Sequence, residues 1–167
     1  MSPRLFGVAT AACAFAIDQG SKLWMLNVFG IAERQPIKIL PVLDIVMVWN
    51  KGVSYGMLRA DTPWGRAALV VFSLAVTFFF AYWLWNSRNR LNAAGLGLII
   101  GAALANATDR MAYGAVADFF DFHTPFYLGP LSNYVFNLAD VAIVAGVALL
   151  LYESVSVADP AKGEKTG

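Results

Sequence analysis

Long apolar runs constrain this chain more than any other feature of its sequence. Residues 67–85 contain no charged side chain, and tryptophans stand near both ends of that run. A transmembrane helix needs about 20 mostly apolar residues, and tryptophan is enriched where such helices meet the membrane surface. The stretches that approach this length are residues 5–29, 64–85, 91–113 and 134–152. We therefore expect four transmembrane helices.

The composition supports a membrane protein. Hydrophobic residues make up 59% of the 167 residues and charged residues only 14%, which is too apolar for a soluble domain of this size. The net charge of +1 offers no electrostatic basis for binding nucleic acid, so none is expected as a partner. Cys13 is the only cysteine, which excludes an internal disulfide bond.

The linkers between these runs differ in kind. Residues 30–63 include β-branched, strand-like segments at 37–40 and 45–49, and Asn50-Lys-Gly52 is typical of a turn. We expect a small extracytoplasmic β element at about residues 30–63, between the first and second helices. Residues 1–153 would then form a single all-α, four-helix membrane domain, followed by a disordered cytoplasmic tail at 154–167.

The polar interruptions of the apolar runs converge on one membrane face. Successive spans reverse direction, so the end of the first helix, the end of the third and the start of the fourth share a side. Polar residues at 18–22, at 106–110 and at 137–140 all lie there. Because polar groups at membrane depth are costly, three coincident clusters indicate a functional site.

The orientation follows less directly from the basic residues. Seven of the twelve Lys and Arg residues lie on the polar side, which opposes a positive-inside assignment. Lys22 and Arg110 belong to the polar clusters themselves, however, and the turn between the second and third helices has two arginines while the next linker has none beyond Arg110. We therefore expect cytoplasmic termini.

Asp118 and Asp140 are the candidate catalytic residues. Asp118 follows the third helix, and Asp140 lies 22 residues later in the first turns of the fourth helix, at the positive end of its dipole. Two carboxylates held close together share one proton, which supplies a base to activate water and an acid for the leaving group. This chemistry suits peptide hydrolysis, with Asp140 as the more readily ionised partner.

Two other functions compete with this hypothesis. Asp118, Asp121 and His123 could contribute to a zinc site, but a chain with one histidine and no H-E-x-x-H motif argues against a metal, and no cofactor is expected. A proton-coupled transporter could use Asp140 or Asp18, although transport needs acids near the middle of the bilayer and here they gather at one face. A cleavage assay with and without EDTA separates these alternatives.

Further polar residues fall on the same side. Asn106, Asp109, Arg110 and Tyr113 have the spacing of one helix face, and Arg110 offers a fork of hydrogen-bond donors. We expect this face to line the site.

Two more pairs belong to this side of the chain. Asp18 and Lys22 are four residues apart, in the order that favours an ion pair within a helix. Asn50 and Gly52 are candidates for contact with the substrate, because loops on rigid scaffolds often have functional roles.

These segments together resemble the lipoprotein signal peptidase (signal peptidase II) family, the aspartyl proteases of bacterial membranes. The motifs that support the resemblance are Asp18-Gln-Gly-Ser-Lys22, Asn50-Lys-Gly-Val-Ser-Tyr-Gly56, Asn106-Ala-Thr-Asp-Arg110, Gly114-Ala-Val-Ala-Asp118-Phe and Phe136-Asn-Leu-Ala-Asp140. The resemblance extends over nearly all of the chain, as far as Tyr152. Ala105, Val53-Ser54-Tyr55 and Val141 depart from the residues usual in the family, which affects substrate preference more than chemistry.

The resemblance implies an activity and roles for residues. The enzyme would cut diacylglyceryl-modified prolipoproteins on the amino side of the lipidated cysteine, in the bacterial inner membrane. It would act as a monomer among membrane lipids and be inhibited by globomycin. The implied catalytic residues are Asp118 and Asp140, the residues that line the site are Asn50, Gly52, Asn106, Arg110 and Asn137, and the structural ones are Asp18, Lys22 and Asp109.

Overall fold

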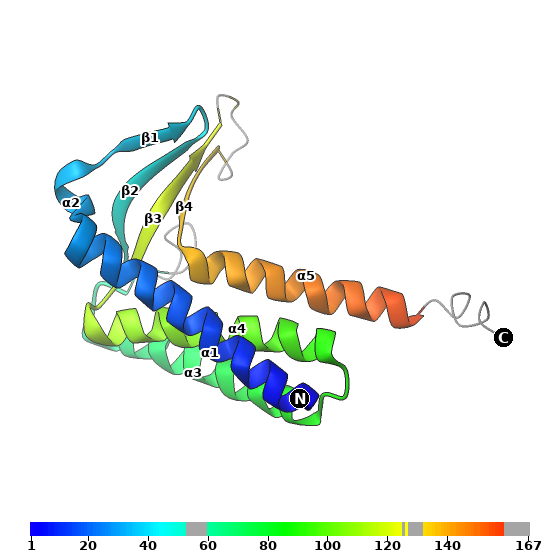
Figure 1. The fold of residues 1–167 in the computed structure, drawn as a ribbon. Coiled ribbons are helices and arrows are strands. Elements are labelled where there is room, and N and C mark those ends of the chain that lie inside the picture. The colour runs from blue at the N-terminus through cyan, green and yellow to red at the C-terminus, as the bar shows by residue number, and fades with distance from the viewer. Residues whose placement is uncertain (53–59, 125, 127–131, 159–167) are drawn as a thin grey trace.

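Four long helices form a bundle with a small β-sheet at one end in the computed structural model, which describes residues 1–52, 60–124, 126 and 132–158 (Figure 1). The helices are α1 (Pro3–Leu23), continued by the π-helix η1 (Trp24–Phe29), then α2 (Ile31–Arg34), α3 (Pro63–Asn86), α4 (Arg90–Ala112) and α5 (Leu138–Ala158). The strands are β1 (Ile37–Leu40), β2 (Leu43–Asn50), β3 (Val116–His123) and β4 (Asn133–Phe136). The N-terminus and the C-terminal end of α5 lie at the other end of the bundle, away from the sheet (Figure 1).

Three helices of the described part of the chain, α3, α4 and α5, are long and apolar enough to cross a membrane. These are the expected second, third and fourth spans. The expected first span corresponds to α1, which is less apolar because it contains Arg4, Asp18 and Lys22. The count of four membrane-spanning helices therefore stays a prediction.

The helix at the centre of the bundle is α4. In its apolar window 67% of the residues are buried, against 11% for α3 and for α5. α4 can pack on several neighbours because glycines on its surface allow close approach. A side chain on Gly97 or Gly101 would collide with backbone carbonyl oxygens of α1, and one on Gly95 would meet Gly146 of α5. The spacing of Gly97 and Gly101 is the small-xxx-small pattern that brings helix backbones together in membranes.

The sheet corrects the expectation of a β element confined to residues 30–63. Its strand order is β1-β2-β3-β4 with antiparallel pairing throughout, so half of it comes from the linker between α4 and α5. Strand β3 is not apparent in the sequence, because Val116 to Phe119 are all buried, on both faces of the strand, and therefore lack the alternation typical of a half-buried strand. Asp118 therefore lies within a strand rather than in a loop after a helix.

Three other boundaries differ from the sequence expectations. The turn between β1 and β2 lies at residues 41–42, whereas Asn50 ends β2. The fourth apolar run begins as strand β4 and becomes helical only at Leu138. α5 continues to Ala158, so residues 154–158 of the expected tail are helical, and residues 159–167 lie outside the described part of the chain.

The close packing of α1 on α4 leads to a test of stability. A Cβ atom on Gly101 would lie 2.9 Å from the Cβ atom of Ala14 and still closer to the carbonyl oxygen of Ala11, whereas one on Gly20 would meet nothing within 4 Å. We expect Gly101→Ala to lower the free energy of unfolding by about 1–3 kcal/mol through overpacking. Gly20→Ala should raise it by about 0.5–1 kcal/mol through helix propensity. Unfolding in mixed micelles, followed by circular dichroism, measures both, and equal effects would contradict the packing described.

Candidate active site

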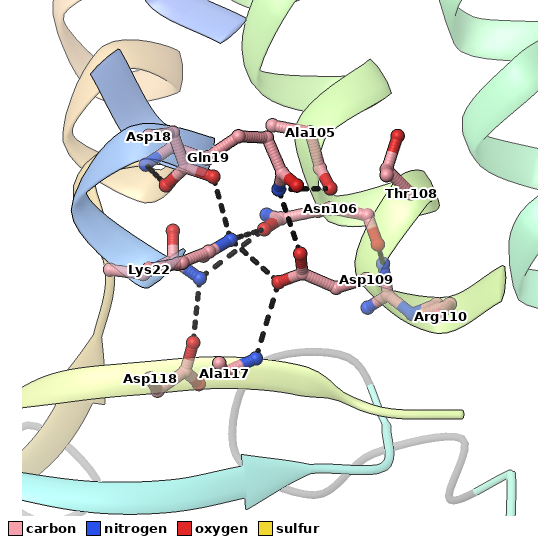
Figure 2. Close-up of polar contacts among 12 residues, drawn as sticks. Asp18, Gln19, Lys22, Ala105, Asn106, Thr108, Asp109, Arg110, Ala117 and Asp118 are labelled. Atoms are coloured by element: carbon pink, nitrogen blue, oxygen red, sulfur yellow. Dashed lines mark hydrogen bonds and ion pairs between the residues drawn. The ribbon is translucent and has the colours of Figure 1, made fainter. Parts of the chain in front are cut away.

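The ammonium group of Lys22 is buried between α1 and α4. Its Nζ atom lies 2.7 Å from Asp18 Oδ2 and 2.7 Å from Asp109 Oδ2, and it donates a hydrogen bond to Asn106 Oδ1 at 3.0 Å. Figure 2 shows these acceptors gathered around the lysine. The Asp18, Lys22 and Asp109 side chains are at most 3% exposed, so the pairing takes place away from solvent. All three protons of the ammonium group therefore have an acceptor, and the predicted pairing of Asp18 with Lys22 is present.

Asp109 connects this lysine to the sheet. Its Oδ2 atom accepts a hydrogen bond from the backbone N–H of Ala117, in strand β3, at 3.3 Å. Its Oδ1 atom accepts one from Gln19 Nε2 at 2.7 Å, and the same Gln19 group donates to the carbonyl of Ala105. Asp109 thus holds β3 against α4 immediately beside Asp118. No sequence pattern predicted this role for Gln19, although Gln19 stands next to Asp18 in the first polar interruption.

Asn137 contacts both candidate catalytic carboxylates. Its Nδ2 atom donates to Asp118 Oδ1 at 2.6 Å and to Asn106 Oδ1 at 3.3 Å. Its backbone N–H donates to Asp140 Oδ2 at 3.1 Å, and its Oδ1 atom accepts from the backbone N–H of Asp140 at 3.0 Å. The last two bonds are reciprocal, as in a capping box at a helix N-terminus. Asn137 therefore starts α5 and at the same time brings Asp140 and Asp118 to one place.

Asp18 fixes the same helix end from outside. Its Oδ1 atom accepts a hydrogen bond from the backbone N–H of Ala139 at 2.9 Å. The first N–H groups of a helix have no partner within the helix, so this carboxylate of α1 satisfies one of them. Asp18 thus contacts the backbone of α5 next to Asp140.

Asp118 is the most protected of the candidate catalytic groups, with 2% of its surface exposed. Its Oδ2 atom accepts a hydrogen bond from Asn50 Nδ2 at 3.0 Å. Burial, and next to it the negative charge of Asp140, raises the pKa of Asp118 to about 7, although the hydrogen bonds from Asn50 and Asn137 oppose this rise. Asp118 can therefore hold a proton near neutral pH.

The two carboxylates open into a cavity of about 200 Å³ between α3, α4 and α5. The polar residues that line it are Asn50, Ser73, Asn106, Arg110, Asp118, Tyr134, Asn137 and Asp140, with Gly52 beside them. Leu69, Phe72, Val76 and Ile143 form an apolar part of the wall. The cavity therefore combines a carboxylate pair with both polar and apolar surface, as a site for an extended peptide requires.

Arg110 lies at the rim of this cavity. Its Nη2 atom donates to the carbonyl of Gly52 at 3.0 Å, which holds the segment that follows β2. Its Nε atom is buried and has no hydrogen-bond acceptor among the described residues. A buried donor of this kind can bind a carbonyl oxygen of a ligand in the cavity.

Other residues named from the sequence lie elsewhere. Asp121 and His123 are on β3 at positions that alternate with Asp118, so their side chains leave the opposite face of the strand. Tyr113 is half exposed and packs on Trp49 with ring centroids 5.3 Å apart. It is not among the residues that line the cavity, so the expectation that it lines the site is wrong. In the described ranges, no group of three His, Cys, Asp or Glu side chains could hold a metal ion.

Two of the residues that differ from those usual in the family, Ala105 and Val141, lie in the described part of the structure. Ala105 is fully buried and packs in one cluster with Ala102 and Ala139, where α4 meets α5. Val141 is half exposed on α5. Val53, Ser54 and Tyr55 lie outside the described residues.

Comparisons with known proteins give one consistent result. Residues 10–156 match a family model described as signal peptidase (SPase) II. The lipoprotein signal peptidase of Methylocella silvestris is 54% identical over 167 residues, covering 100% of this chain and 94% of that relative. The lipoprotein signal peptidase of Nitrobacter hamburgensis is 49% identical over 154 residues, covering 92% of this chain and 94% of the relative.

A solved structure has the same fold. A bacterial membrane enzyme determined by the in meso method at 2.3 Å resolution superposes with a TM-score of 0.77 over 96% of this chain and 94% of that chain. The two sequences are 21% identical, so the likeness concerns the fold.

The buried lysine generates a prediction about stability. Lys22→Met would leave the carboxylates of Asp18 and Asp109 buried without a cation, and we expect a loss of about 3–5 kcal/mol in the free energy of unfolding. Lys38→Met, on the exposed surface of β1, is the matched control and should change it by less than about 0.5 kcal/mol. Unfolding in mixed micelles compares the two. Similar midpoints for both variants would show that the Lys22 ammonium does not hold α1 and α4 together.

The raised pKa of Asp118 generates a prediction about pH. The pKa of Asp118 is about 7 in the folded protein, whereas the ordinary pKa of an aspartate, which we take for the unfolded chain, is 3.8. Between these two pH values the folded chain therefore binds a proton that the unfolded chain has released. The free energy of unfolding therefore falls as pH rises through this window and is level above it. Asp118→Asn removes this contribution. We expect the difference between wild type and variant to change by on the order of 3 kcal/mol from pH 4 to pH 8, and a constant difference would refute the raised pKa.

Proposed function

The chain belongs to the signal peptidase II family, and on this basis we propose that it is an aspartic endopeptidase that cuts prolipoproteins on the amino side of a diacylglyceryl-modified cysteine. Its general activity, the removal of signal peptides from lipoproteins, follows from the family and from relatives that match along the whole chain. The observation that supports the aspartic mechanism is the position of Asn137, which is hydrogen-bonded to both Asp118 and Asp140.

The two carboxyl groups have different roles in hydrolysis, Asp118 as the acid and Asp140 as the base. Asp118 holds the shared proton because its pKa is raised to about 7, and Asp140 is ionised. Asp140 takes a proton from a water molecule as the water oxygen attacks the scissile carbonyl carbon. Asp118 donates its proton to the carbonyl oxygen, which gives a neutral tetrahedral diol.

Collapse of this intermediate completes the reaction. The proton now on Asp140 passes to the amide nitrogen, the C–N bond breaks, and Asp118 takes back a proton from one hydroxyl of the diol. The products are a new carboxyl group on the signal peptide and the amino group of the lipidated cysteine. Both carboxylates then have the protonation with which they began, so no metal ion or cofactor is required.

The surrounding polar residues hold the reacting groups. Asn50 and Asn137 each donate to one oxygen of Asp118 and fix the plane of its carboxyl group. Arg110 offers its buried Nε–H to a carbonyl oxygen of the substrate backbone. Asp18, Lys22 and Asp109 do not line the cavity themselves. They hold its lining in place, because Lys22 donates to Asn106, Asp18 accepts from the backbone of Ala139 at the start of α5, and Asp109 accepts from the backbone of Ala117 beside Asp118.

We place the site at the extracytoplasmic face of the bacterial inner membrane. The sheet, with Asp118 on β3, and the start of α5, with Asp140, lie at one end of the bundle. The N-terminus, the C-terminal end of α5 and the turn from α3 to α4 lie at the other (Figure 1). Arg88 and Arg90 are in or next to that turn, as the positive-inside rule requires for a cytoplasmic end. All the site residues come from one chain, so a monomer among membrane lipids suffices, and globomycin-type peptides would compete for the cavity.

Substitution of either carboxylate tests the mechanism. We expect Asp118→Asn and Asp140→Asn to lower the rate of cleavage of a diacylglyceryl-modified peptide by at least about 100-fold, because each removes a proton-transfer group. Asp44→Asn, on β2 at a distance from the cavity lining, is the matched control and should retain activity. The measurement is turnover by purified protein with and without EDTA, with globomycin as a reference inhibitor. Near-normal turnover by either Asn variant, or loss of activity in EDTA, would reject the aspartyl pair.

A further inference from the structure

A second apolar space adjoins the carboxylate pair, on the side of α5 that faces away from α4. It is a groove of about 460 Å³ between the sheet and the helix, which we call the α5 groove. Its walls are Phe122, Tyr134 and Phe136 from the sheet, and Asp140, Val141, Val144, Ala145 and Ala148 from α5. No step of the hydrolysis described above uses this groove.

The shape of the groove follows from its residues. Tyr134 and Phe136 have stacked rings 5.9 Å apart and form an aromatic wall where the sheet meets the helix. Ala145 and Ala148 are one helical turn apart on the floor, and their small side chains leave a channel along α5. Val144 is 70% exposed, so the groove is open toward the surrounding membrane.

The lining of the groove favours a hydrocarbon chain over a peptide backbone as its ligand. A peptide in an apolar environment needs partners for its backbone N–H and C=O groups. Apart from the carboxyl of Asp140 and the hydroxyl of Tyr134, every side chain that lines the groove is apolar. The catalytic cavity, in contrast, has Asn50, Asn106 and Arg110 to bind a backbone. An unbranched hydrocarbon chain needs no such partners and fits the groove.

The groove begins at the reacting groups. Asp140 and Tyr134 line both the catalytic cavity and the α5 groove, so the two spaces lie next to each other at these two side chains. In the proposed reaction the residue after the scissile bond has the diacylglyceryl group on its sulfur atom. Its acyl chains must therefore start close to Asp140 and leave the site through an apolar exit.

We propose that the α5 groove binds one acyl chain of the diacylglyceryl group of the substrate. This assignment rests on the proposed function and adds to it a position for the lipid. From Asp140 to Ala148 the helix rises by about 12 Å, so Ala148 marks the far end of the groove. A long acyl chain reaches Ala148 and a short one does not.

The experiment uses Ala148→Phe in the full-length protein and two substrates that differ only in acyl length. The substrates are synthetic peptides with a dipalmitoyl-glyceryl or a dihexanoyl-glyceryl cysteine. Phenylalanine at position 148 fills the far end of the groove, and we expect it to raise KM for the dipalmitoyl substrate by about fivefold with kcat unchanged, because it removes binding that is equal in ground state and transition state. The KM for the dihexanoyl substrate should not change.

The matched control is Ala81→Phe, which adds the same side chain to an exposed position on α3 outside both cavities. It should leave both KM values at the wild-type level. If Ala148→Phe raises neither KM, or raises both equally, the groove does not bind a substrate acyl chain. If the wild-type protein cleaves neither substrate, the proposed function itself fails, and the two failures are therefore distinguishable.

Discussion

The ammonium group of Lys22 is the constraint on which the rest of the site depends. A buried charge is tolerated only when it is paired and hydrogen-bonded, and Lys22 meets this requirement with Asp18, Asp109 and Asn106. Each of these partners then makes a second contact: Asp18 with the start of α5, Asp109 with β3, and Asn106 with Asn137. A single cation of α1 therefore determines where the strand with Asp118 and the helix with Asp140 meet.

This arrangement is possible because the helices approach one another closely. Gly97 and Gly101 bring the backbone of α4 against α1, and Gly95 brings it against α5. Short side chains such as Asp109 and Asn106 can reach across a helix interface only when the backbones are near. The close glycine packing of α4 on its neighbours is therefore what allows the polar network between the helices to form.

The two candidate catalytic residues are held by different kinds of structure. Asp118 lies in a strand, paired with Val48 of β2, and β2 also ends in Asn50, which donates to the Asp118 carboxylate. Asp140 lies in the first turn of a helix and is oriented by the cap that Asn137 forms. Asn137 stands between strand β4 and α5, and because it binds both carboxylates it keeps them together as a pair. On the other side of Asp140 the α5 groove leads into the membrane, which suits a substrate that is both peptide and lipid.

Much of this protein could be predicted from its sequence, because apolar length and polar interruptions are local properties. They identified the segments that became α3, α4 and α5, the pairing of Asp18 with Lys22, and the convergence of Asp118, Asn137 and Asp140 on one end of the bundle. Strand β3 could not be predicted, because its buried residues lie on both faces and leave no alternation in the sequence. Nor could the partners of Gln19, Asp109 and Asn137, since hydrogen bonds between residues far apart in the chain have no spacing that a sequence pattern records. The sequence alone determined which side chains are polar within an apolar chain, whereas only tertiary packing decided which of them meet at the cavity, which hold a helix end, and which face the membrane.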